Sequence, residues 1–422
     1  MTVRAGVAVL DITPGPGTPL SGFAVRTAPA SGVHDVLSVR ALCVGDTALV
    51  TVDVVGLHET LCRRVRDRCA DLAPHVVVHA THTHGGPASM PGRLGGDPDP
   101  RWLATVEQAC VDAVRAAAGR REDVLVLAGV GTDPGVARNR RRPDGPVDRD
   151  LPVVRFVRDD GTTLAVLVSH ACHPVVLGPH NTLLTADYPA VVRGRLERTL
   201  ATTVLHATGC AGDVNTGHGA ADSFRTATSA DRTFAASARA GARVADAALR
   251  AVPAHGSSPG SVGGRSVPVL LDLEVDGPAE RRRAAARWSA ARAGADPAAD
   301  ALYRCWADWA RAVPVDAPRT WAGDVTVLSW GPVTLVALPG EPFAATAATV
   351  RARLAATAER PVVVIGYSNG VPGYLPTVDE YPLGGYEVLD AHRYYGMPGR
   401  FAPGSAERVA DAAVRAAAGI GS

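Results

Sequence analysis

The sequence predicts an α/β fold in which a mixed β-sheet core is covered by helices. Stretches with strand character alternate along the chain with helical patterns, as is typical of α/β proteins. The stretch HVVVHA at 75–80 is short and almost continuously apolar, as expected for a strand buried on both faces. Apolar residues make up 46% of the 422 residues but aromatic residues only 5%, so small aliphatic side chains are available to pack helices closely on sheets.

The periodicity of apolar residues places the individual elements. Residues 59–72 are expected to form an amphipathic helix, because Leu61, Val65 and Cys69 recur at helical spacing. Further helices are expected at 101–119, 188–201, 228–251, 278–294, 297–312, 342–357 and 405–418. Strands are expected at 3–12, 47–55, 75–80, 123–129, 151–157, 163–169, 203–208, 266–275, 324–337 and 361–367. There is no internal repeat, and one segment, 253–265, has the Gly-, Ser- and Pro-containing composition of a linker.

The balance of charge argues against two classes of function. The 43 basic and 42 acidic residues nearly cancel, whereas a protein that binds nucleic acid or a membrane surface needs a basic excess on some face. No apolar run approaches the ~20 residues that a membrane span requires. We therefore expect neither nucleic-acid binding nor stable membrane association. The basic run RNRRR at 138–142 is expected to be mainly a solvated face.

The cysteines and the N-terminus favour a cytoplasmic location. Seven cysteines are scattered along the chain without a CxxC pair, which is typical of reduced, mostly buried thiols and not of a disulfide framework. The N-terminal stretch MTVRAGVAVLDITPG lacks the apolar segment and cleavage site of a signal peptide, and its alternation predicts a strand instead.

Residues that can bind a metal recur where predicted strands end. HATHTHGGP at 79–87 follows a buried strand and contains three histidines, and LVSHACHPVVLGPHN at 167–181 contains three more. Asp213 follows another strand, Glu341 lies in LPGEPF, and the stretch 365–388 is rich in glycine and tyrosine. Loops at strand ends are where α/β proteins place their chemistry.

This combination of side chains suits zinc. Two imidazoles, a carboxylate and a further oxygen ligand form a zinc set that leaves room for a water molecule, whose pKa falls to roughly 7. Side chains two residues apart in an extended segment point the same way. We therefore expect His82 and His84 to face one site, one on the metal and one beside the bound water.

A simpler interpretation is also open from the residues alone. Asp213 in a glycine turn suits an Asx-turn or a cap, and Glu341 just before a helix suits the helix dipole. Isolated histidines at strand ends are commonly satisfied polar residues, and four are expected in that role: His79, His170, His180 and His206. No single element is as specific as HExxH, so spacing alone does not decide between a metal site and unrelated polar residues.

Seven motifs, taken in order, resemble those of the neutral ceramidases, a family of zinc-dependent amidases that cleave N-acyl sphingosines. The motifs are LDITP, ATHTHGGP, ARNR, ACHPVVLG…TADYPA, GCAGDVN, LPGEPF and GYSNGVPGYLPTVDEYPLGGYE. They extend over nearly the whole chain, and the ordered set is far more specific than any one of them. The resemblance implies a ceramidase-like catalytic fold and a single domain over 1–422, in spite of the linker-like segment.

The resemblance also implies which residues hold the zinc ion. His82, the first histidine of HTH, and His173 in SHACHPV match the two zinc histidines of the family. Glu341 in PGE matches the acidic ligand, and Tyr374 in PGYLPT matches the tyrosine ligand.

Four further positions are implied in the active site. His84 matches the catalytic histidine beside the metal, which is expected to pass a proton from the attacking water to the leaving amine. Arg140 matches an arginine that faces the scissile carbonyl and Tyr386 a second active-site tyrosine; both are expected to hold the developing oxyanion. Asn215 stands where the family has a serine, and its amide is expected to donate to the substrate carbonyl. Two aspartates are expected to orient the histidines: Asp187 and Asp213.

The expected function is therefore hydrolysis of the amide bond of an N-acyl substrate by zinc-activated water. Asn215 departs from the family pattern, and neither a secretion signal nor a C-terminal immunoglobulin-like domain is expected; both points favour a small soluble substrate over membrane ceramide. One alternative is a zinc-dependent acyltransferase or cyclase that forms an amide in small-molecule metabolism. Another is a binding module without catalysis. The sequence predicts neither the acyl group, nor the amine, nor the oligomeric state.

Overall fold

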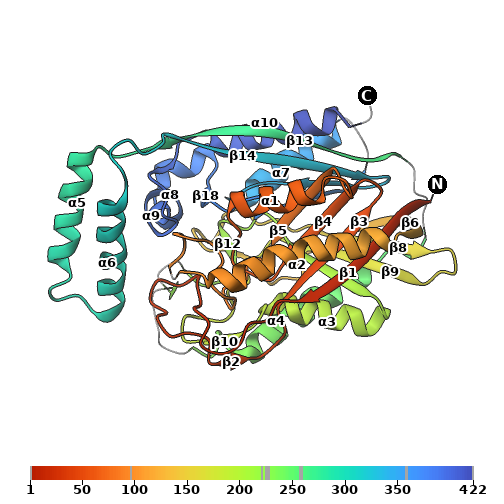
Figure 1. The fold of residues 1–422 in the computed structure, drawn as a ribbon, viewed down its shortest axis with the longest axis horizontal. Coiled ribbons are helices and arrows are strands. Elements are labelled where there is room, and N and C mark those ends of the chain that lie inside the picture. Colours follow the sequence, from red (N-terminus) through yellow and green to blue (C-terminus); the bar gives the residue numbers. More distant parts are fainter. Residues whose placement is uncertain are drawn as a thin grey trace.

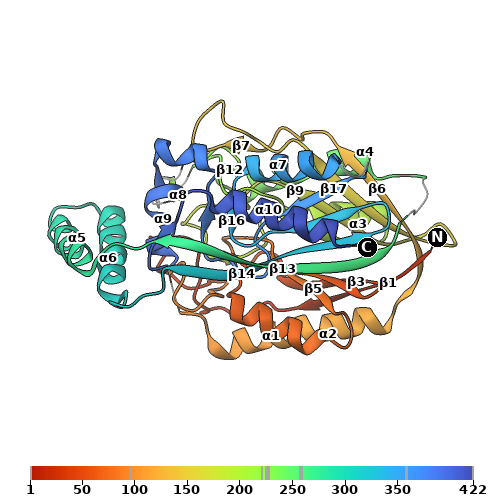
Figure 2. The same cartoon turned by 90° about the horizontal axis from the view of Figure 1, so that it is seen from above.

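Two β-sheets packed face to face form the centre of the protein (Figures 1 and 2). The structure is a computed structural model that describes every residue except 1, 96, 220–221, 224–228, 256–259, 357–359 and 421–422. The larger sheet has the order β11-β9-β8-β6-β1-β3-β4-β5 and is mixed, because β4–β5 and β9–β11 are parallel and the other pairs antiparallel. Its strands are β1 (Val3–Asp11), β3 (Ser38–Val44), β4 (Thr47–Val52), β5 (His75–Ala80), β6 (Glu122–Gly131), β8 (Leu151–Arg158), β9 (Thr163–His170) and β11 (Thr203–Thr208).

The smaller sheet has the order β17-β15-β14-β13-β19. Its strands are β13 (Val262–Glu274), β14 (Thr320–Trp330), β15 (Thr334–Ala337), β17 (Val362–Ile365) and β19 (Arg400–Phe401). A buried apolar layer joins the two sheets, in which Phe156 of the larger sheet contacts Trp330 of the smaller with ring centroids 5.8 Å apart. The Trp330 indole N–H also donates to Thr47 Oγ1 at 2.8 Å. The two sheets therefore share one apolar core, to which both contribute side chains.

Helices cover both outer faces of this pair of sheets. The helices α1 (Glu59–Cys69) and α2 (Pro100–Gly119) pack beside β1, β3 and β5, and α3 (Tyr188–Leu200) and α4 (Phe234–Ala251) pack on β8 and β11. The smaller sheet is covered by α7 (Ala344–Ala355) and α10 (Ser405–Ala418), as Figure 2 shows. A hairpin of α5 (Pro278–Ala291) and α6 (Pro297–Ala312) projects from the far end of the β13–β14 ribbon (Figure 1).

Short elements surround the ends of the central strands. Three two-stranded pairs lie here: β2 (Gly32–Val33) with β10 (Leu183–Leu184), β7 (Arg138–Asn139) with β12 (Val214–Asn215), and β16 (Glu341–Pro342) with β18 (Tyr374–Leu375). They are followed by the 3₁₀ helix η2 (Val378–Leu383) and the short helices α8 (Tyr386–Leu389) and α9 (Ala391–Tyr394). The loops after β5, β9 and β11 therefore end among segments that come from all parts of the chain.

The predicted α/β class with helices over a mixed sheet is confirmed, but there are two sheets instead of one. The range 324–337 is a hairpin of β14 and β15, because the turn at Gly331 has a positive φ of 71° that breaks a single strand. The central strand β3 was not predicted at all. Part of the linker-like segment, 256–259, lies outside the described residues, and 262–265 begins β13.

Two further expectations concern the thiols and the membrane. All seven cysteines are free, and all but Cys305 are buried, as expected. Among the helices that the structure describes, none is long and apolar enough to cross a bilayer.

Candidate active site

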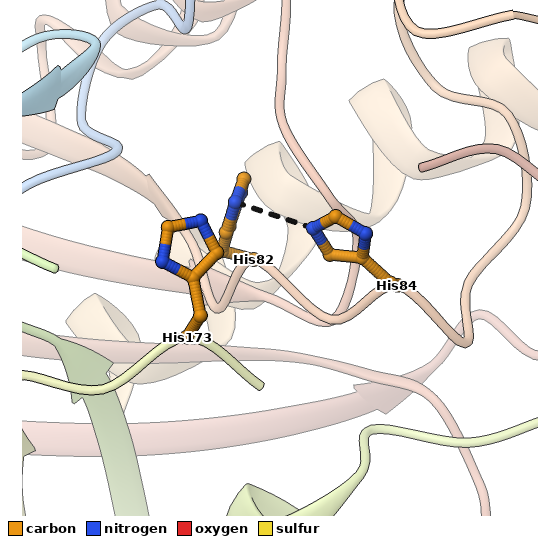
Figure 3. Close-up of side chains that lie close together, drawn as sticks. All are labelled: His82, His84 and His173. Atoms are coloured by element: carbon orange, nitrogen blue, oxygen red, sulfur yellow. Dashed lines mark hydrogen bonds between the residues drawn. The ribbon is translucent and has the colours of Figure 1, made fainter. Parts of the chain in front are cut away.

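Three histidine side chains form a cluster where loops leave β5 and β9 (Figure 3). His82, His84 and His173 each place one ring nitrogen within 4.8 Å of the others. His82 and His173 are buried, whereas His84 is partly exposed. The common site predicted for His82 and His84 is thus confirmed. The structure adds His173 to it from about ninety positions further along the chain, as the resemblance implied.

The backbone that brings His82 and His84 together differs from the predicted one. The HTH segment is not extended, because His82 has a positive φ of 66°, in the left-handed region that side chains rarely adopt. The surroundings hold this conformation: the His82 N–H donates to Val54 O at 2.9 Å, and Tyr367 stacks on the imidazole with centroids 4.1 Å apart. Strained backbone of this kind is common at functional sites. A left-handed turn, not strand periodicity, therefore places the two Nε2 atoms 3.4 Å apart.

Backbone carbonyl groups orient all three imidazoles. The Nδ1 atom of His82 faces Val55 O, that of His84 lies 3.0 Å from Gly22 O, and that of His173 lies 2.6 Å from Ala211 O. A carbonyl can only accept, so each Nδ1 carries the proton and each Nε2 keeps its lone pair. Burial also lowers the pKa of His173 to about 4, which keeps this imidazole neutral near pH 7.

The expectation that Asp187 and Asp213 orient the histidines is wrong. The Asp187 carboxylate accepts from the N–H groups of Tyr188 and Leu177 and thereby caps the start of α3. Asp213 accepts from Ala344 N–H at the first residue of α7 and from the Asn139 side chain, so it does act as a cap, as the simpler interpretation held. Both carboxylates satisfy helix ends, and carbonyl groups take the place beside the imidazoles.

Glu341 completes the histidine cluster. Its Oε2 atom lies 3.2 Å from His82 Nε2 and 2.8 Å from His173 Nε2, while Oε1 accepts a hydrogen bond from the Tyr395 hydroxyl. Glu341 stands in β16, three residues before α7, and its carboxylate points to the imidazoles and not to the helix end. The Glu341 carboxylate therefore does not complement the dipole of α7, and this alternative interpretation is wrong. The register of β16 and β18 places Tyr374 directly opposite Glu341.

The donor atoms of this cluster fit a metal ion. His173 Nε2 and Glu341 Oε2 are buried, and the structure describes no partner for either atom outside the cluster, where they lie 2.8 Å apart. Because His173 Nε2 keeps its lone pair, both atoms are acceptors and cannot satisfy each other. An unsatisfied buried polar atom costs about 1–3 kcal/mol, which favours a cation between the two. Imidazole nitrogen and carboxylate oxygen are the ligand atoms that zinc prefers.

Arg140 and Tyr374 lie next to each other beside the histidine cluster. Arg140 Nη2 donates to Tyr374 Oη at 2.9 Å and to Gly212 O at 2.8 Å, and its Nε lies 2.9 Å from a Glu387 carboxylate oxygen. The Tyr374 ring lies 6.4 Å from that of His173 and 6.1 Å from that of Tyr386, measured between centroids. Seven of the eight residues implied by the resemblance thus lie in one contiguous group: His82, His84, Arg140, His173, Glu341, Tyr374 and Tyr386. Asn215 is at its edge, next to Val214, whose carbonyl accepts from the His173 N–H.

The basic run 138–142 is not mainly a solvated face. The side chains of Arg140 and Arg141 are only 6% and 8% exposed. Arg141 pairs with both Glu380 and Glu387, and Arg142 also reaches Glu380. The run instead fastens the segment that carries Tyr386.

Asn215 uses its side chain to close a turn. Its Oδ1 atom accepts from the N–H groups of Gly217 and His218, and its Nδ2 atom donates to His218 O at 2.7 Å. The Nδ2 atom carries two hydrogens, so the expected donation to a substrate carbonyl would use the second of them. The role of Asn215 in the reaction stays a prediction.

The four histidines expected to be satisfied polar residues differ in their contacts. His79 is satisfied, since Nδ1 lies 2.9 Å from Gly366 O and Nε2 accepts from Thr208 N–H. His180 and His170 each have one ring nitrogen in contact, with Arg232 O and Tyr188 Oη respectively. For His206 the expectation is wrong, because it is fully buried and neither ring nitrogen bonds to a described residue.

Two tyrosines were missed from the sequence. Tyr395 holds Glu341 and Tyr367 stacks on His82, and both are buried. Tyr395 lies beyond the last motif of the resemblance. The one sequence feature that marks Tyr395 is its position in a pair, Tyr394–Tyr395, in a chain that has only eight tyrosines.

Comparison with known proteins gives structural neighbours. No protein-family model and no curated protein matches the sequence. A solved ceramidase complexed with C2 superposes with a TM-score of 0.76 at 18% identity, covering 99% of this chain and 75% of that one. The neutral ceramidase from Pseudomonas aeruginosa gives 0.76 at 17% identity, covering 99% and 74%. The chain therefore has the fold of the neutral ceramidases over almost its whole described length, as the motifs predicted.

Proposed function

We propose that the protein is a zinc-dependent amidohydrolase that cleaves the amide bond of a small, soluble N-acyl substrate. The observation that carries the proposal is the convergence of His82, His173 and Glu341 on one point. The structure describes no partner outside the cluster for the buried atoms His173 Nε2 and Glu341 Oε2. The fold supports the type of reaction, since both structural neighbours are named as ceramidases.

His82, His173 and Glu341 would hold the ion, and Tyr374, opposite Glu341 on β18, would be the fourth ligand. Zinc in such a set lowers the pKa of water to about 7 and polarises a carbonyl oxygen. The chain's own part is to fix these donors before any ligand arrives, which it does through carbonyl groups and Tyr395.

His84 is positioned to move a proton. Its Nδ1 atom is fixed by Gly22 O, so its Nε2 atom faces the cluster and is 3.4 Å from His82 Nε2. Burial lowers the pKa of His84 well below its usual value, so the imidazole is neutral at neutral pH and free to accept a proton. Of the three histidines, His84 is the one that is partly exposed.

Arg140 supplies a fixed positive charge for the developing oxyanion. Glu387 and the carbonyl of Gly212 hold its guanidinium in place beside Tyr374. A preorganised donor of this kind contributes on the order of 10²–10³ in kcat. Tyr386, whose ring lies edge-on to that of Tyr374 with centroids 6.1 Å apart, would donate a second hydrogen bond.

The composition of the chain supports a class of partner and a cellular compartment. Near-balanced charge supports a small-molecule partner over nucleic acid or a membrane surface, and seven free thiols support a reducing compartment such as the cytoplasm.

Metal analysis and a substrate panel test the proposal. Purified protein should contain about one zinc ion per chain, and His82→Ala and His173→Ala should each lose most of it. His84→Ala should keep the zinc and lose turnover, and the exposed His255→Ala should change neither. Wild-type protein should hydrolyse short N-acyl amides faster than long-chain ceramide. Full activity without metal would refute the zinc assignment, and amide formation from an added amine would favour an acyltransferase.

A further inference from the structure

A cavity lies beside the segments that carry the site residues. Its volume is about 350 Å³, and we call it the α4 cavity, because one face of α4 forms a wall through Ala236, Arg239, Ala240 and Arg243. These positions are spaced by three or four residues and therefore share one side of the helix. The opposite wall comes from the strand pair β7–β12 and the loops that follow β9 and β12.

The lining of the α4 cavity is rich in unpaired positive charge. The exposed side chains of Arg239 and Arg243 form no hydrogen bond or ion pair with any residue that the structure describes. Among the described residues, the Arg138 side chain donates to the backbone carbonyls of Gly135 and Ala137 and to no acidic side chain. Asp231 is the one acidic residue among the described lining residues, against three arginines.

A polar group in the same cavity lacks a partner. The hydroxyl oxygen of Thr216 is inaccessible to solvent and forms no hydrogen bond with a described residue. An unsatisfied buried hydroxyl is costly, and a hydroxyl together with guanidinium groups forms a donor set for oxyanions. Ala236 and Ala240 stand between the arginines on this face of α4, so small side chains line the cavity there.

We propose that the α4 cavity binds an anionic oxygen group, a carboxylate or a phosphate. Guanidinium groups recognise both through paired, charge-assisted hydrogen bonds. The anion is either carried by the amide substrate, which rests on the proposed function, or it is a separate small anion. For the first source the substrate class is an N-acylated amino acid or a similar acid.

Residues that line the α4 cavity are close in sequence to candidate site residues. Arg138 pairs with Asn215 in the β7–β12 register and stands two residues before Arg140. Val176, which also lines the cavity, follows His173 by three residues. A bound anion would therefore contact the same short segments that position the candidate catalytic groups.

Direct binding tests the proposal without any turnover. Inorganic phosphate and acetate are titrated calorimetrically into wild type, the Arg239→Gln/Arg243→Gln double variant and a control double variant, Arg250→Gln/Arg283→Gln. The control changes the charge equally through exposed arginines outside the cavity. Ionic strength is held constant, because salt screens exposed charges. We expect saturable binding to wild type and control, and about tenfold weaker binding to the cavity variant.

Kinetics distinguish the two sources of the anion. If the substrate carries it, the cavity variant raises KM for an N-acyl amino acid about tenfold with little change in kcat, and leaves its methyl ester unaffected. If the anion is separate, both substrates keep their KM while phosphate or acetate binding is lost. Equal behaviour of the cavity and control variants in both experiments overturns the proposal. An enzyme inactive on every amide refutes the proposed function alone, since the titration still decides the anion site.

Discussion

The Tyr395 hydroxyl fixes one oxygen of Glu341, while the other oxygen faces His82 and His173. A carboxylate held at one oxygen has a single orientation in which the second oxygen can serve the metal. Groups that hold metal ligands in this way commonly contribute 10–100-fold to metal affinity. In the proposed zinc site, Tyr395 would therefore be a positioning residue for Glu341.

We expect Tyr395→Phe to weaken zinc binding by about 10–100-fold while the protein stays folded, because the ring is kept and only the hydroxyl is lost. The measurement is competition with a chelator, alongside circular dichroism. Tyr381→Phe is the control, since its hydroxyl donates to Phe401 O away from the cluster. Unchanged zinc affinity in Tyr395→Phe would show that Glu341 is held by other contacts.

The sequence predicts the residues that form the cluster better than the residues that hold them in place. His82, His84, His173 and Glu341 all follow strand ends, where the pattern of apolar residues breaks into polar ones, so local sequence marks them. Tyr395 carries no such mark, because its partner lies 54 residues away and only the tertiary fold brings the two together. The left-handed φ of His82 was equally unpredictable, since histidine itself does not favour it.

The segment from η2 to α8 is the element that carries Tyr386, and three arginine side chains hold it. Arg141 makes the largest number of these contacts: to Glu380, to Glu387 and to the carbonyl of Gly384. Such a planar fork reaches several acceptors at once, which a lysine ammonium cannot do. The order of this segment therefore depends on arginine specifically.

Arg141→Lys should lower kcat about tenfold with an unchanged zinc content, because Tyr386 and Glu387 lose their fixed position. Arg142→Lys should have a smaller effect, since its side chain is 43% exposed and reaches Glu380 alone. Steady-state kinetics and metal analysis of both variants give the comparison. Loss of zinc in Arg141→Lys would mean that the segment also supports the metal ligands.

The start of α1 holds the loop that follows the HTH motif through a bidentate ion pair. The Glu59 carboxylate accepts from Arg93 at 2.7 and 2.8 Å. Burial alone would raise the pKa of Glu59, but the Arg93 guanidinium lowers it to about 2 from its usual 4.5. A carboxyl group whose pKa is lowered by folding stabilises the native state above its unfolded pKa, and this contribution is lost as the pH falls.

Glu59→Gln should therefore lower the free energy of unfolding by about 2 kcal/mol at pH 7. The difference from wild type should shrink as the pH falls from about 4.5 towards 2, where the wild-type carboxyl becomes protonated. Denaturant unfolding at several pH values measures this. Glu274→Gln, which breaks a more exposed pair with Arg400, should cost no more than about 1 kcal/mol. A constant difference at all pH values would contradict the ionic origin.

At the scale of the whole molecule, the sequence predicts the elements but not how they form two sheets. Most helices and strands lie within a few residues of their predicted bounds, because apolar periodicity is a local property. The strand β3 was missed since Ser38 and Arg40 interrupt its apolar pattern; Arg40 is satisfied by Glu197 from α3. Which strands pair is decided by contacts between distant segments, which periodicity does not encode.

The predicted single domain over 1–422 can be tested through the layer between the sheets. Trp330 lies at its centre, fully buried, with its ring against Phe156 and its indole N–H on Thr47. Because residues of both sheets form this one core, neither sheet retains a complete core when the other unfolds.

Trp330→Ala should therefore destabilise the whole molecule by about 3–5 kcal/mol, the usual cost of truncating a buried Trp. Urea unfolding followed by far-UV circular dichroism and by fluorescence should give coincident transitions in wild type, and both should shift together in the variant. Trp306→Ala, in the α5–α6 hairpin outside that core, is the control and should shift them less. Separate transitions for the two probes would mean that the sheets are independent folding units, so the site between their loops would be assembled from two domains.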